Sequence, residues 1–161
     1  MPEMIPLGWF HTIMGIIALV SGIYTLYKYK EIKMENRSGL IYLIATLITA
    51  ATALMIFQHG AFGPPHGFAV LTLGALAVGT LAAKTALFGR FSRYLQGFSY
   101  TAALLFHGIP AVSESMLRLP PGDPIVDSFE NPILGIMLLS LVVIFLVGVS
   151  LQLRWISKNP A

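Results

Sequence analysis

Cysteine is absent from the 161 residues, and charged residues make up only 11% of the chain. The missing cysteines exclude disulfides and thiolate metal sites, so any metal would depend on His, carboxylate or Met side chains. The low charge, with 56% hydrophobic residues and a mean hydropathy of +0.78, leaves too little polar surface for a soluble domain. The sequence therefore predicts an integral membrane protein.

The apolar runs also lack the alternation of apolar and polar residues that marks strands of a membrane barrel. Each run is about 20 residues long, which is the length of a membrane-spanning helix. We therefore predict an all-α integral membrane helical bundle, with residues 1–161 forming a single transmembrane domain. Its five transmembrane helices are expected at about 7–27, 39–58, 65–83, 94–112 and 133–153, with an outer cap loop at about 113–131.

Basic residues are concentrated on one side of these five spans. With the N-terminus outside, nine of the ten Lys and Arg fall in the two loops and the tail on the inner side, and only Arg118 lies opposite. This distribution predicts an N-out, C-in topology, and we expect the plasma (inner) membrane. Because juxtamembrane residues account for the net charge of +3, nucleic acid is not an expected partner. No positive segment precedes the first apolar run, so we expect no cleavable targeting segment.

Proline and glycine mark the expected helix ends. Pro64 and Pro65 suit the first turn of the third helix, where a missing N–H costs nothing, and they place His66 in that turn. Gly108 and Pro110 are expected to end or kink the fourth helix. Residues 119–124 read Leu-Pro-Pro-Gly-Asp-Pro and predict a turn-rich part of the cap loop.

All four histidines are predicted at the outer ends of the helices. His11 and His107 lie about one turn inside the first and fourth helices, whereas His59 closes the second and His66 opens the third. Ionisable groups within membrane spans are costly and tend to mark function. We therefore expect a site for haem or a metal ion on the outer side.

The residues beside His11 bear on which ligand this would be. Gly15, Ala18 and Gly22 share a helix face with it, and such a face is either a cofactor slot or a surface for close helix packing. Haem needs one or two imidazoles at an apolar slot, with a polar or cationic group near its propionates. The candidate residues for binding haem b are His11, His66, His107, His59 and Arg118.

A copper or zinc site is the alternative, and it needs three or four close ligands. Four imidazoles at one level fit this number, and their depths fit two axial pairs or a dinuclear site equally well. Glu114 or Asp123 could act as a base beside a metal-bound water. The candidate metal ligands are His11, His59, His66, His107 and Glu114.

One segment resembles a known family. Residues 62–73 read Phe-Gly-Pro-Pro-His-Gly-Phe-Ala-Val-Leu-Thr-Leu and resemble a segment of small multi-pass membrane proteins that share a domain of unknown function. His11 and Gly15 are similar to that family's opening His-x-x-x-Gly. Members often begin the second helix with His and Arg, where this chain has Asn36 and Arg37. The family is distantly similar in layout to haem b membrane cytochromes, so the resemblance implies a haem or redox-linked role with only the outer site present.

Three functions follow from these patterns. The first is a b-type haem protein in electron transfer, linked to quinol or an outer acceptor, as a membrane oxidoreductase or an electron-transfer subunit. We expect His11 with His107 or His66 as its ligands, ahead of His59. The second is an outer-face copper or zinc protein for metal handling or a metal-assisted reaction. The third is a structural subunit, whose partners besides the lipid bilayer would be other membrane subunits or a second copy.

Overall fold

The computed structural model describes residues 6–57, 62–85 and 87–160, and this part of the chain is all-α, without a strand. Three of its five α-helices are long and apolar enough to cross a membrane, while α2 is apolar but shorter. The predicted helical class is thus confirmed. The helices are α1 (Pro6–Tyr29), α2 (Arg37–Ala53), α3 (Pro64–Lys84), α4 (Ser92–Arg118) and α5 (Pro132–Lys158), with a 3-10 turn, η1 (Gly89–Phe91), before α4.

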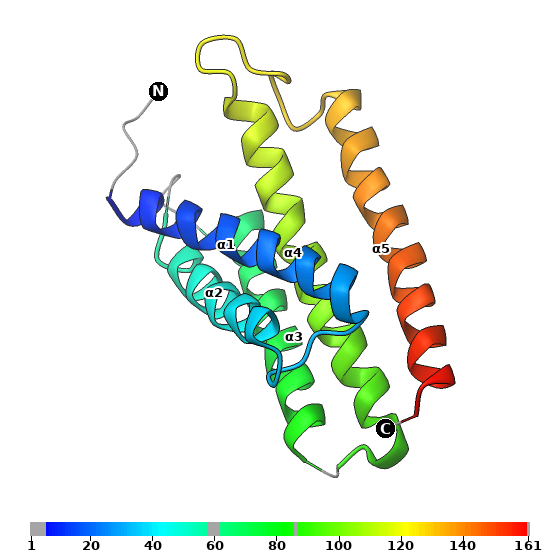
Figure 1. The fold of residues 1–161 in the computed structure, drawn as a ribbon. Coiled ribbons are helices and arrows are strands. Elements are labelled where there is room, and N and C mark those ends of the chain that lie inside the picture. The colour runs from blue at the N-terminus through cyan, green and yellow to red at the C-terminus, as the bar shows by residue number, and fades with distance from the viewer. Residues whose placement is uncertain (1–5, 58–61, 86, 161) are drawn as a thin grey trace.

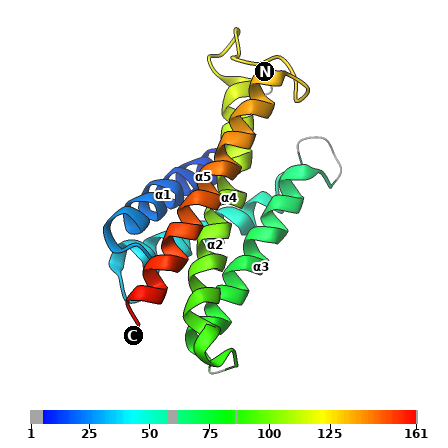
Figure 2. The same ribbon diagram turned by 90° about the vertical axis from the view of Figure 1, so that its right-hand side faces the viewer.

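Helix α4 lies at the centre of the bundle. It packs against α3 and α5 and is crossed by the α1–α2 pair, which runs obliquely to it in both views (Figures 1 and 2). The neighbouring helices enclose polar residues of α4, among them Ser99, Tyr100 and Thr101. A central helix can carry such residues because they meet protein rather than lipid. This position explains why α4 is less apolar than α1, α3 and α5.

Two predicted helix ends are wrong. α4 continues through Pro110 to Arg118, because a proline is tolerated inside a helix that its neighbours support. The next residue, Leu119, is extended and therefore ends the helix. It precedes Pro120, and a proline ring disfavours helical backbone in the residue before it. The cap loop therefore begins at residue 119, not 113. α2 ends at Ala53 instead of 58, in a tighter turn where Met55 N–H donates to the Thr52 carbonyl.

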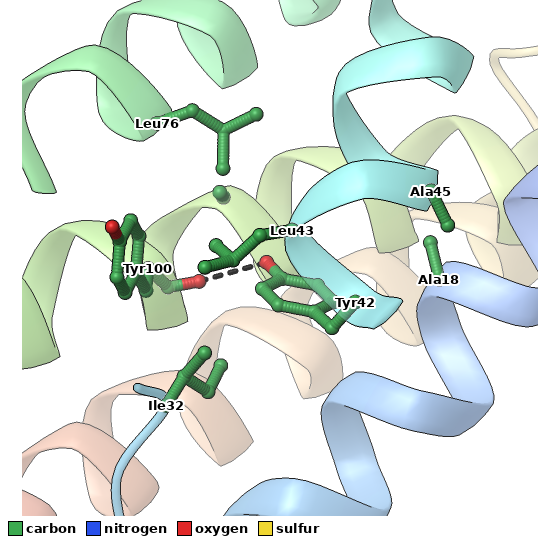
Figure 3. Close-up of a cluster of buried hydrophobic side chains, with 8 residues drawn as sticks. Ala18, Ile32, Tyr42, Leu43, Ala45, Leu76 and Tyr100 are labelled. Atoms are coloured by element: carbon green, nitrogen blue, oxygen red, sulfur yellow. Dashed lines mark hydrogen bonds between the residues drawn. The ribbon is translucent and has the colours of Figure 1, made fainter. Parts of the chain in front are cut away.

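Two buried tyrosines hold four helices together. A methyl group on Gly22 of α1 would lie 2.7 Å from the Tyr42 ring of α2, and one on Gly79 of α3 would lie 2.5 Å from the Tyr100 ring of α4. The Tyr42 hydroxyl donates to the Tyr100 carbonyl at 2.8 Å, drawn as the dashed line in Figure 3. The Tyr100 hydroxyl lies 3.1 Å from Oγ1 of Thr80. Each ring thus occupies space that only a glycine on the facing helix leaves open.

An ion pair fastens the α1–α2 loop to α4. Arg93 donates to Glu31 through Nε at 2.9 Å and Nη2 at 2.8 Å, and Lys33 lies 2.7 Å from the same carboxylate. Arg93 also donates from Nη1 to the Asn159 carbonyl, just beyond α5. Burial alone would raise the pKa of Glu31, but the hydrogen bonds and charges of Arg93 and Lys33 lower it below the usual 4.5.

We predict that Gly22→Ala and Gly79→Ala each lower the free energy of unfolding by about 1–3 kcal/mol, because the new methyl group overlaps the Tyr42 or Tyr100 ring. Gly74→Ala is the matched control, since a methyl there meets no atom within 4 Å. It should leave stability unchanged or raise it. Denaturant titration of the detergent-solubilised protein measures the difference. Equal effects of all three substitutions would refute this packing account.

We predict that Glu31→Gln lowers the free energy of unfolding by about 1–3 kcal/mol at neutral pH, because charge-assisted hydrogen bonds are lost. Since folding lowers the Glu31 pKa, the ion pair stabilises fully above 4.5, and this contribution is lost as the pH falls through the folded-state pKa. The wild type and the variant should therefore converge in acid. Glu114→Gln, in an exposed pair with Arg118, is the control and should change stability little. A difference that persists in acid would contradict the role of Glu31.

Candidate functional site

His11 on α1 is fixed by α2. Its Nδ1 lies 3.1 Å from the Thr49 carbonyl oxygen and 3.1 Å from Oγ1 of Thr52. A carbonyl only accepts hydrogen bonds, so Nδ1 carries the hydrogen and Nε2 keeps a free lone pair. Histidines that bind metals usually have this arrangement, in which a bond from the second nitrogen orients the ring. The two threonines were not among the predicted site residues.

His107 on α4 meets α1 beside His11. A methyl group on Gly15 would lie 3.2 Å from Nε2 of His107 and 3.6 Å from Cγ2 of Thr49. Gly15 is one helical turn from His11, about 6 Å along the axis. Thr49 therefore contacts both the His11 ring and the Gly15 position that His107 reaches. His107 meets α1 one helical turn away from His11. The structure thus brings the predicted residues His11 and His107 together.

The small-residue face of α1 is a packing surface. The Gly15 position is occupied from the α4 side by His107, and the Gly22 position is filled by Tyr42 and by Leu104, whose Cδ1 would be 3.0 Å from an added methyl group. Ala18 between them is completely buried. Of the two readings of this face, close helix packing is therefore the one that the structure has.

His66 is placed differently from the pair. It lies in the first turn of α3, as the two prolines predict, and only 4% of it is exposed. Its Nδ1 accepts a hydrogen bond of 3.1 Å from the Gly63 N–H, so the hydrogen is on Nε2. Within the described chain this buried Nε2 has no hydrogen-bond partner. His66 is thus a donor in its neutral form, which is unsuited to binding a metal through Nε2.

Two aromatic rings flank His66, and the sequence reasoning missed both. The Phe57 ring centroid lies 4.7 Å from that of His66, and the Phe62 ring stacks on it at 5.0 Å. Both phenylalanines are more than half exposed. In the sequence the two phenylalanines stand on either side of residues 58–61, and this spacing does not show that they face His66.

The other predicted residues do not join one site. His59 lies outside the described residues. Glu114 is on α4, not in a loop, and its carboxylate is 2.6 Å from Nε of Arg118, so these two candidates pair with each other. Among the described residues, no group of three or more His, Asp or Glu is arranged to hold a metal ion. Residues 6–57, 62–85 and 87–160 therefore supply no metal shell of the predicted size.

Comparison of the chain with family models, with curated proteins and with solved structures gave no match. The geometry of the histidines and the apolar character of the helices are therefore the features that bear on function.

Proposed function

We propose that this chain is an integral membrane electron-transfer protein that binds a b-type haem through His11 and His107. The observation that carries the proposal is the bond from His11 Nδ1 to the Thr49 carbonyl, which fixes the ring and leaves Nε2 available as a ligand. His107 supplies a second imidazole beside it, at Gly15. Paired imidazoles from different helices are a ligand set suited to haem iron. When bound, the haem supplies a one-electron redox centre.

The donor set fits haem, and the surroundings restrict where the porphyrin can lie. The α1 face between Gly15 and Gly22 is filled by side chains, so it offers no slot. Residues 104–112 of α4 flank His107 and are all only partly buried, unlike residues 99–103, which are fully buried. Apart from His107, residues 104–112 carry no charged or ionisable side chain. These apolar side chains are the ones that would surround a haem held by His107.

The proposed topology has five spans, with the N-terminus and the histidine pair on the outer side of the plasma membrane. The distribution of Lys and Arg supports this orientation. The 17 residues of α2 give a length of about 25 Å, close to the thickness of the hydrocarbon layer. The 27 residues of α4 exceed it at about 40 Å. We place both helices across the membrane with α1, α3 and α5, with α2 at the short end of the range for spanning helices.

A copper or zinc site is less well supported than haem. Such a site needs three or four protein ligands, whereas haem iron needs only two. The described residues bring two imidazoles together and no third His, Asp or Glu. The number of available ligands therefore favours haem.

We predict that the purified protein has a Soret band that shifts on reduction with dithionite. His11→Ala and His107→Ala should each remove most of the bound haem, because the one remaining imidazole would hold it less firmly. His66→Ala is the matched control: it also removes an imidazole, but the hydrogen bond from the Gly63 N–H to Nδ1 makes His66 a donor through Nε2. It should keep the haem. Haem per chain is measured by absorbance against protein content.

Two results would overturn the proposal. One is a colourless protein from cells that were supplied with haem precursors. The other is loss of haem in His66→Ala together with retention in His11→Ala and His107→Ala.

A further inference from the structure

The Nε2–H of His66 is a hydrogen-bond donor that is buried beside two phenylalanine rings. The bond from the Gly63 N–H to Nδ1 fixes both the ring orientation and the tautomer. Buried polar groups are nearly always paired, so a buried donor without a partner needs an explanation. An acceptor brought by a ligand is such an explanation.

The aromatic neighbours indicate the shape of that ligand. Phe57 and Phe62 lie on the His66 ring at 4.7 Å and 5.0 Å, with interplanar angles of 33° and 30°. The two residues are 55% and 66% exposed, so they offer apolar surface next to the buried donor. Offset stacking between flat rings is favourable at such separations. The matching ligand is a flat conjugated ring that carries a carbonyl oxygen.

We propose that His66, Phe57 and Phe62 form a quinone-binding site, in which a quinone carbonyl accepts a hydrogen bond from Nε2 of His66 while the quinone ring stacks on the phenylalanines. The proposal rests on the proposed electron-transfer function, for which it names the substrate class, and it concerns binding alone. The site is separate from the haem ligands, since His66 is not part of the His11–His107 pair. Location in the first turn of α3 places it near the end of a membrane helix, where a lipid-soluble quinone has access.

Binding of decylubiquinone and of menadione to the purified full-length protein in detergent tests the site. Isothermal titration calorimetry should show saturable binding of at least one of them to the wild type. His66→Ala and Phe62→Ala should each weaken it about tenfold or more, the factor that one net hydrogen bond or a stacking contact is worth. His66→Gln, which keeps an N–H donor, should retain part of the affinity. Val70→Ala, an exposed position one turn further along α3, should bind like the wild type.

Haem content, measured on the same samples, separates the two proposals. If His11→Ala and His107→Ala lack haem but bind quinone, both proposals stand. If no sample contains haem while quinone binding is lost only at His66 and Phe62, the haem proposal fails and the quinone site stands. Unfolding midpoints close to the wild type in His66→Gln and Phe62→Ala show that lost affinity is not lost folding.

The quinone site is overturned if neither quinone binds saturably to the wild type, or if His66→Ala binds as tightly as the wild type. A lipid ester carbonyl is the other acceptor that Nε2–H could meet in a membrane. Titration with a short-chain phosphatidylcholine tests this source. If that lipid binds saturably with the same dependence on His66 and displaces both quinones, the site is a lipid site and the proposal is wrong.

Discussion

The bundle depends on the packing of two tyrosine rings against two glycines. Tyr42 lies over Gly22 and Tyr100 over Gly79, and the Tyr42 hydroxyl donates to the Tyr100 carbonyl, so four helices converge at one buried point. A side chain larger than hydrogen at either glycine would push the helices apart. The contact at Gly22 therefore determines how closely α1 packs against α2 and α4. Along α1, Gly15 and His11 lie about two and three turns before Gly22, so the position of the histidine pair depends on this contact.

The Glu31–Arg93 ion pair restrains the same helices just beyond the C-terminal end of α1. It ties the α1–α2 loop to the start of α4, and the Arg93 bond to Asn159 adds the end of α5. The ion pair and the tyrosine contact thus both restrain the C-terminal half of α1. Such restraint matters for His11, because rotation of α1 by a fraction of a turn would move its ring away from Thr49. Contacts far from the histidines therefore help to fix the orientation of the His11 ring.

The sequence predicted the helical class and placed Pro64 and Pro65 in the first turn of α3, because long apolar runs and paired prolines act through local chemistry. It did not predict the end of α4, since Pro110 is tolerated only where neighbouring helices support the backbone. The face of Gly15 and Gly22 could be read as a slot or as a packing surface, and only the partner side chains decide between them. The hydrogen bond from His11 to Thr49 could not be predicted either, because it depends on how α1 and α2 are rotated relative to each other.

One chemical contrast distinguishes the two histidine sites: His11 carries its hydrogen on Nδ1, and His66 carries it on Nε2. The first state leaves a lone pair for iron, and the second leaves a donor for a carbonyl. Nitrogen-15 NMR of the haem-free protein, labelled at histidine and assigned with single variants, reads these tautomers directly. We expect a protonated Nδ1 and an unprotonated Nε2 in His11, and the reverse in His66. The same tautomer in both rings would contradict the account.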